Sequence, residues 1–183
     1  MIWRDEVVGG MTKTALIVGA GNGISGSFAR RFAADGGRVV LAARNTDKLS
    51  HYVDEIGATV LRCDATRLDE VDAVFTELDR LGGSLDVELY NASARAGGAF
   101  VDLDPAAVAR AINISAYGGF VVAQQAAKRM TKAGHGTILF TGASASVKGY
   151  KESAAFAMGK FALRGLAQSM ARELAPQGVH VAH

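Results

Sequence analysis

The chain of 183 residues has one cysteine, Cys63, and almost no excess of either charge. A single thiol forms no internal disulfide, which excludes a disulfide-stapled domain and suits a reducing, cytoplasmic location. Because neither a second cysteine nor a histidine lies near it in the sequence, Cys63 is predicted to be a buried strand residue rather than a metal ligand. The net charge of +2 is too small to indicate a nucleic-acid or membrane partner. The four histidines have no metal-binding spacing and are predicted to be structural or exposed: His51, His135, His180 and His183.

The sequence also has no recognisable targeting segment, linker or internal repeat. Its first ten residues, MIWRDEVVGG, carry charges where a signal peptide needs an apolar run. Residues 1–10 are therefore interpreted as an upstream extension or a cloning remnant, and residues 11–183 as one domain. The alanine-rich stretch 106–127 is interrupted by polar side chains, so it is not expected to span a membrane.

What the sequence does contain is a regular alternation of short apolar runs and amphipathic segments. Apolar runs bounded by turn residues predict strands, and apolar residues at helical spacing predict helices. The predicted strands are 14–20, 38–44, 58–66, 85–93, 135–144 and 178–183, and the predicted helices are 24–37, 46–57, 67–83, 104–134 and 153–178. Strands that are apolar throughout and alternate with helices predict an α/β fold, with a parallel sheet covered on both faces in three αβα layers.

The segment LIVGAGNGISG joins the first predicted strand to the first predicted helix. Gly21, Gly23 and Gly26 fit the GxGxxG pattern of a dinucleotide-binding loop. Glycines permit a tight turn and close approach of the backbone, and the helix N-terminus attracts a pyrophosphate. Three more residues of this loop are predicted to contact the nucleotide: Gly19, Asn22 and Ile24. A turn without a ligand is the alternative.

The end of the second predicted strand, AARN, indicates which nucleotide this is. NAD usually meets an acidic residue here, whereas an arginine accommodates the 2′-phosphate of NADP. Arg44, followed by Asn45, can bind a phosphate with two parallel hydrogen bonds, so NADP(H) is favoured over NAD(H). Residues 19–23 are also similar to the GxGxG loop of methyltransferases that bind S-adenosylmethionine, but those typically have an acid where Arg44 stands. The remaining alternative is that Arg44 is a surface arginine at the end of the strand and binds no nucleotide.

With these motifs the chain resembles the short-chain dehydrogenase/reductase family over residues 12–183. Cys63-Asp64-Ala65-Thr66 resembles the family segment that holds the adenine, and Tyr90-Asn91-Ala92-Ser93 resembles its Asn-Asn-Ala-Gly signature. KFALRGLAQSMAREL matches the family's long sixth helix. The resemblance implies a Rossmann-type doubly wound sheet of strand order 3-2-1-4-5-6. It also implies a seventh strand, which is missing from residues 1–183, either because the sequence is truncated or because that segment is absent. It also implies cofactor contacts from five residues: Asp64, Ala65, Asn91, Ala92 and Ser93.

The family's catalytic residues are a Lys, a Tyr, a Ser and a helix Asn. Lys160 matches the Lys, which implies a role in holding the nicotinamide ribose. The Tyr position, four residues earlier, is Phe156, which cannot exchange a proton. The Asn position is Ser115, and Asn113 lies two residues too early to share its helix face.

The family's Ser is displaced as well. Its position is Ala143, with Ser144 one residue and Ser146 three residues away. Tyr150, on the segment expected to border the nicotinamide, and Ser144 are therefore candidates for a replacement proton donor. Each is alternatively a loop or turn residue without a catalytic role.

These residues predict an NAD(P)H-dependent oxidoreductase that transfers hydride to or from a carbonyl or alcohol, with a non-standard proton donor. The alternative is an inactive NADP(H)-binding or regulatory module, and a methyltransferase is a distant third. The helices 104–134 and 153–176 resemble those that pair in family dimers, which implies a dimer or tetramer acting on a small-molecule substrate. The identity of that substrate is not readable from the sequence.

Overall fold

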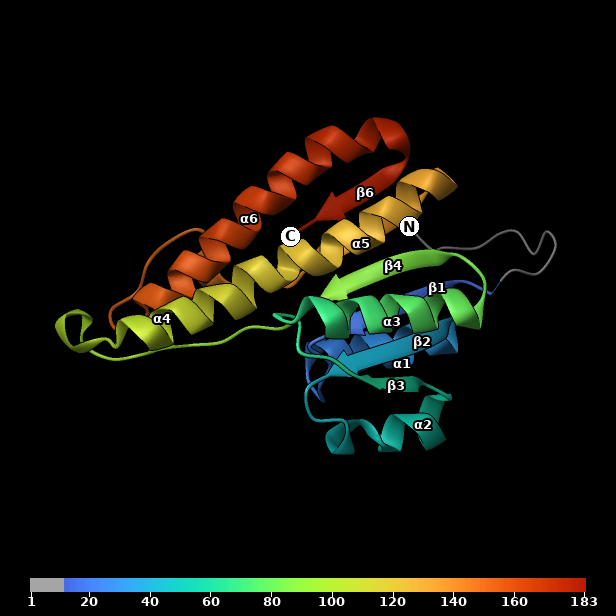
Figure 1. The fold of residues 1–183 in the computed structure, drawn as a ribbon, viewed down its shortest axis with the longest axis horizontal. Coiled ribbons are helices and arrows are strands. Elements are labelled where there is room, and N and C mark those ends of the chain that lie inside the picture. The colour runs from blue at the N-terminus through green and yellow to red at the C-terminus, as the bar shows by residue number, and fades with distance from the viewer. Residues whose placement is uncertain (1–11) are drawn as a thin grey trace.

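In the computed structural model, which describes residues 12–183, six parallel strands form one sheet. The predicted extension, residues 1–10, lies outside the described residues. The strands are β1 (Thr14–Val18), β2 (Arg38–Ala43), β3 (Thr59–Arg62), β4 (Leu85–Tyr90), β5 (Gly136–Phe140) and β6 (Val179–Ala182). Their order across the sheet is β3-β2-β1-β4-β5-β6, which confirms the predicted Rossmann-type topology (Figure 1).

Helices cover both faces of the sheet and make the predicted three layers (Figure 1). The helices are α1 (Ile24–Ala34), α2 (His51–Ile56), α3 (Leu68–Leu81), α4 (Pro105–Ile112), α5 (Gly118–Ala133) and α6 (Ala154–Leu174). The first two pack on one face, and α3, α5 and α6 pack on the other. Figure 1 shows α4 projecting beyond the carboxyl ends of the strands, beside the start of α6.

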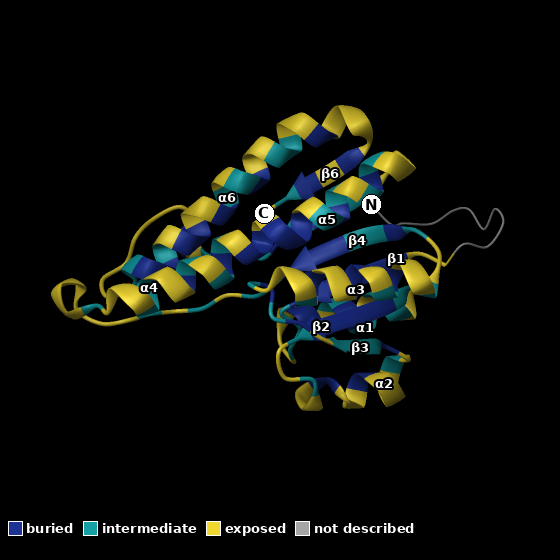
Figure 2. Cartoon of the chain, in the orientation of Figure 1, coloured by how far each residue is buried: buried dark blue, intermediate teal, exposed yellow. Residues whose placement is uncertain are grey.

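The core has two parts because alternate residues of a strand point to opposite faces. Ile17 and Leu41 pack with Ala29 of α1 on one face, whereas Leu16 packs with Leu163 of α6 on the other. Figure 2 shows the buried strands between helices that are exposed on their outer sides. The apolar core also contains a carboxyl group: Glu88 of β4 is 0% exposed, and neither of its oxygens has a hydrogen-bond partner among residues 12–183.

Three predicted helices differ in detail from the observed ones. The segment predicted as 46–57 begins with a 3₁₀ turn, Asp47–Leu49, and the Thr46 side chain makes no capping hydrogen bond. The segment 104–134 contains a π-helical turn, Asn113–Tyr117, between α4 and α5. Its start is as predicted, because Asp104 accepts hydrogen bonds from two amides of the first turn. The last helix ends at Leu174, and a 3₁₀ turn containing the second proline of the chain follows it.

Among the described residues, one helical stretch, Pro105–Ala133, is long and apolar enough to cross a membrane by length and composition. From the sequence, the polar residues in this stretch are expected to exclude a membrane span, but by length and composition alone they do not. The packing is that of a core helix, since Val122, Ala126 and Met130 of α5 are fully buried against the sheet.

Candidate cofactor and substrate site

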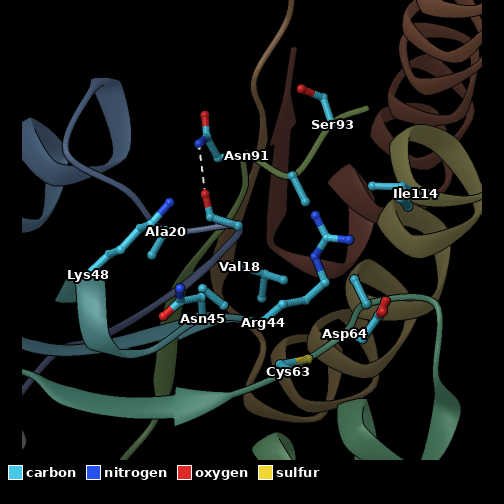
Figure 3. Close-up of a pocket in the computed structure, with 14 residues that line it drawn as sticks. Val18, Ala20, Arg44, Asn45, Lys48, Cys63, Asp64, Asn91, Ser93 and Ile114 are labelled. Atoms are coloured by element: carbon cyan, nitrogen blue, oxygen red, sulfur yellow. Dashed lines mark hydrogen bonds between the residues drawn. The ribbon is translucent and has the colours of Figure 1, made fainter. Parts of the chain in front are cut away.

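The first glycine of the loop is fixed by close packing between β1 and β4. Gly19 has φ +79°, and a Cβ there would collide with the backbone nitrogen of Ala92. Its own amide donates to the carbonyl of Ala42, 2.9 Å away. The side-chain amide of Asn91 donates to the Gly19 carbonyl at 2.9 Å (Figure 3). This position therefore needs glycine for its conformation and for the approach of β4.

The next two loop glycines are open. A Cβ added at Gly21 or Gly23 would meet no atom within 4 Å, so a ligand can approach the backbone there. The Ser25 hydroxyl holds the turn by accepting from the amide of Gly21 at 3.0 Å and donating to its carbonyl at 3.1 Å. Gly26 instead permits close packing against the Tyr52 ring. Free backbone at the N-terminus of α1 fits a pyrophosphate.

A cavity of about 310 Å³ opens beside this loop at the carboxyl ends of the strands (Figure 3). It is lined by Val18, Gly19, Ala20, Ala43, Arg44, Asn45, Lys48, Cys63, Asp64, Ala65, Asn91, Ala92, Ser93 and Ile114. In Figure 3 the Arg44 side chain reaches over the cavity, and Lys48 approaches from the side of Ala20. Neither cation has an ion-pair partner among the residues that the structure describes. The size and the charge fit an adenosine that carries a phosphate.

Two groups after β3 form the floor of this cavity. Burial acts to raise the pKa of Asp64, but hydrogen bonds from Thr66 and the charges of Arg44 and Arg67 outweigh it and lower that pKa. Asp64 is therefore an ionised acceptor. Cys63 is buried, as predicted, one residue beyond the end of β3. Burial and nearby acids raise its pKa to about 11, so the thiol is not a nucleophile at neutral pH.

A chain of hydrogen bonds joins the glycine loop to α6. The side-chain oxygen of Asn91 accepts from the hydroxyl of Thr141 at 2.9 Å. The carbonyl of Thr141 accepts from the ammonium of Lys160 at 2.6 Å. Lys160 is only 3% exposed, and burial together with the charge of Arg95 lowers its pKa. The lysine is thus held at the end of β5, next to the loop that follows it.

Phe156 occupies the position of the family tyrosine. It is buried, and the guanidinium carbon of Arg95 lies 3.9 Å from its ring centroid. The Lys160 ammonium lies 5.8 Å from the same centroid. The phenylalanine has no proton to give, so any proton donor must come from elsewhere.

The π-helical turn places Ser115 against the loop after β4. Ser115 is 0% exposed and its hydroxyl accepts from the amide of Ala94 at 3.1 Å. Ser115 also packs closely against α6, where a Cβ added to Gly159 would collide with its side chain. Asn113 is exposed on the opposite side of the helix. Ser115 therefore positions a loop and does not face open space.

The candidate replacement donor, Tyr150, lies in the loop between β5 and α6. A hydrogen bond with Ser144 and the charge of Lys148, whose ammonium is 5.0 Å from the ring centroid, lower the pKa of Tyr150. Ser146 is buried and interacts with His183 at 3.2 Å instead. A tyrosine, a serine and a lysine thus meet in this loop.

The structure brings the predicted adenosine residues together and leaves others apart. Gly21, Asn22, Gly23 and Ile24 are not among the residues that line the cavity, and neither is Lys160, which reaches from α6 to the end of β5. Sequence reasoning did not identify Lys48, Ile114, Thr141 or Arg95. Lys48 could have been found as a second cation four residues after Arg44, whereas no local motif marks the others. The described residues contain no cluster of histidine, cysteine and acids that could hold a metal.

The fold and this cavity define a dinucleotide-binding α/β protein. The profile of the short chain dehydrogenase family matches residues 13–183, and the chain belongs to that family. The reductase MabA of Mycobacterium avium, which acts on 3-oxoacyl-[acyl-carrier-protein], is 30% identical over 169 residues. That match covers 92% of this chain and 64% of the relative.

Solved structures agree. A short-chain dehydrogenase from Rhodopseudomonas palustris has a TM-score of 0.87 and 38% identity, covering 93% of this chain and 82% of that one. A gluconate 5-dehydrogenase from Burkholderia cenocepacia, in complex with NADP and tartrate, has a TM-score of 0.84 and 26% identity, covering 93% and 70%. The chain spans about two thirds of the length of the mycobacterial reductases it matches.

Proposed function

We propose that this protein is an NADP(H)-dependent oxidoreductase that interconverts a carbonyl and an alcohol on a small molecule. The observation that carries the proposal is the pair of cations, Arg44 and Lys48, at the adenosine cavity beside an open glycine loop. Two cations that form no ion pair within residues 12–183 are suited to the 2′-phosphate that distinguishes NADP from NAD. The NADP-bound gluconate 5-dehydrogenase is consistent with this choice.

The other residues of the site have separate roles in cofactor binding and proton transfer. Lys160 holds the nicotinamide ribose hydroxyls, and Asp64 holds the adenine. When bound, the cofactor supplies or accepts the hydride. Tyr150 gives a proton to the substrate oxygen during reduction and takes it back during oxidation. Ser144 and Lys148 favour the ionised phenol and so bring its pKa closer to neutral.

The test is oxidation of NADPH by the purified protein with a panel of aldehydes, ketones and quinones. Turnover that falls by about 10²–10⁴-fold in Tyr150→Phe supports the proposal, since positioned acid–base catalysis contributes that much. No oxidation of NADPH with any member of the panel would refute it. Tyr117→Phe, an exposed tyrosine of the π-helical turn, is the matched control.

A second candidate is favoured by Phe156: an NADP(H)-binding module without turnover. Its ring is covered by Arg95 and offers no hydroxyl. This candidate predicts NADPH binding without hydride transfer, unchanged in Phe156→Tyr. Appreciable turnover in the native protein would exclude it.

We further propose a cytoplasmic homodimer or tetramer built through α5 and α6. Exposed apolar side chains lie on this part of the molecule: Tyr117, Phe120, Met158 and Phe161. Burying them against a second copy would remove apolar surface from water. Light scattering should therefore give at least twice the monomer mass, and Phe161→Glu should lower it.

A further inference from the structure

The loop after β4 carries an arginine whose position the family motifs do not explain. Arg95 is two residues beyond Ser93, which lines the adenosine cavity, and the guanidinium carbon of Arg95 lies 3.9 Å from the centroid of the Phe156 ring. It is exposed, and no described carboxylate lies within ion-pair distance of it. Because the N–H donors lie in the plane of the guanidinium, stacking on the ring leaves them available for hydrogen bonds.

Two anchors fix this loop. On one side the buried Ser115 hydroxyl accepts from the amide of Ala94, the residue immediately before the arginine. On the other side the amide of Gly98 donates to the carbonyl of Glu152, 3.4 Å away in the loop before α6. Together with the Phe156 ring, these contacts hold Arg95 in one place. A solvated surface arginine would not need such support.

Two cations, Arg95 and Lys160, lie at the Phe156 ring. The buried Lys160 lies within 6 Å of the same ring, as the distance of 5.8 Å to its centroid shows. Its charge and that of Arg164 add to burial in lowering the pKa of His183. Glu152, whose carbonyl holds Gly98 of this loop, pairs its carboxylate with Lys151 at 3.7 Å. Like charges held close together without a counter-ion favour the binding of an anion.

The cofactor does not account for this anion site. The phosphates of a dinucleotide find the open backbone of Gly21 and Gly23, and the cations Arg44 and Lys48, on the other side of the cavity. Arg95 instead stacks on Phe156 in the first turn of α6, near Lys160, where the proposed function expects the substrate. The anion there must belong to the substrate.

We propose that the substrate carries a carboxylate close to its reacting carbon, and that Arg95, stacked on Phe156 and positioned by Ser115, binds this carboxylate. The substrate class is then an oxo acid or the corresponding hydroxy acid. This inference rests on the proposed NADP(H)-dependent oxidoreductase activity. It also gives Phe156 a role: the ring is the platform for the guanidinium, which it binds through a cation–π contact.

The experiment uses the whole protein and three acids, pyruvate, acetoacetate and phenylglyoxylate, each with its methyl ester. Calorimetry first measures the affinity for NADP⁺, and then the binding of each compound to the NADP⁺-saturated protein. At least one acid should bind, and its ester should bind about tenfold to a hundredfold more weakly, as expected for loss of a charge-assisted hydrogen bond. Where NADPH is oxidised, kcat/KM should show the same preference.

Variants then assign the preference to the arginine. Arg95→Gln should remove it while leaving the affinity for NADP⁺ unchanged. Ser115→Ala should reduce the ratio of acid to ester binding, since the loop loses one anchor, also at unchanged NADP⁺ affinity. The control is Arg172→Gln, an exposed arginine near the end of α6, which should change neither.

The outcomes separate this inference from the function it rests on. If the protein binds no NADP⁺, the proposed oxidoreductase function is wrong. If it binds NADP⁺ but binds no acid, binds esters as well as acids, or keeps its preference in Arg95→Gln, the carboxylate inference alone is overturned. An acid preference that disappears in Arg95→Gln and persists in Arg172→Gln supports it.

Discussion

Replacing the buried carboxyl of Glu88 is predicted to stabilise the protein. Its side chain points into the face of the sheet that α5 covers, and its register partners are Leu16 on β1 and Ile138 on β5, both 0% exposed. Both carboxyl oxygens are buried and have no partner in the described part of the chain, which costs about 1–3 kcal/mol in mutational data. Glu88→Met keeps the volume close and removes the polar group. We expect a gain of about 2 kcal/mol at pH 7, or roughly 4–8 °C in Tm for a chain of this size.

The effect should depend on pH in a defined direction. Burial raises the pKa of Glu88 well above its usual value, so the folded protein keeps a proton that the unfolded chain releases. The folded state binds more protons, and stability therefore falls as pH rises, by at most about 1.4 kcal/mol per pH unit, from the unfolded pKa up to the folded one. The Glu88→Met variant has no carboxyl group at this position, so its stability does not fall with pH for this reason. The gap between the two proteins should be smallest near pH 4 and grow toward neutral pH.

The assay is urea unfolding of both proteins at several pH values. Glu88→Gln keeps the shape and polarity of the side chain but cannot ionise. The difference in free energy of unfolding between this variant and the native protein should therefore also grow with pH. Glu173→Gln, on the exposed face of α6, controls for the loss of one carboxylate. Destabilisation of more than about 1 kcal/mol by Glu88→Met, or a gap that is constant with pH, would refute the reasoning.

Three other predictions concern the site. Arg44→Gln, and separately Lys48→Gln, should weaken NADPH binding by about tenfold to a hundredfold and leave NADH binding unchanged; equal losses for both nucleotides would contradict the 2′-phosphate contact. Carbonyl reduction needs the protonated phenol, so kcat should fall as pH rises through the lowered pKa of Tyr150, and Ser144→Ala, which removes the main cause of the lowering, should move that limb to higher pH. A profile that does not move would show that another group donates the proton. Gly19→Ala forces a side chain into a left-handed backbone against β4, and urea unfolding should show a loss of about 1–3 kcal/mol; unchanged stability would mean that the loop can shift.

The fold was predictable because each strand and helix has its own local signal. Apolar runs closed by glycine, and helices that begin at Asp104 or end at Gly134, define the order of elements without tertiary information. Boundaries were less accurate where packing decides them. The π-helical turn at 113–117 has no signature in the sequence, and it is what turns Ser115 inward.

The adenosine half of the site was predictable from consecutive motifs, whereas the substrate half was not. Arg95 and Phe156 are 61 residues apart in the sequence, and they meet only because the loop after β4 folds against the start of α6. The run LDVELY predicted a buried strand, but Glu88 was not identified from the sequence as a buried acid within it. Alternation along the strand could have flagged it, since Glu88 shares a face with Tyr90.

The hydrogen bonds that run from Gly19 through Asn91 to Thr141 cross-link the ends of three adjacent strands. Amide exchange at those ends should accordingly occur in one concerted opening rather than separately at each strand. Because these strand ends are rigid, changes in the shape of the site must come from the two flanking loops, 94–103 and 142–153. Substrate choice can then diverge through mutations in these loops while the grip on the nucleotide stays the same.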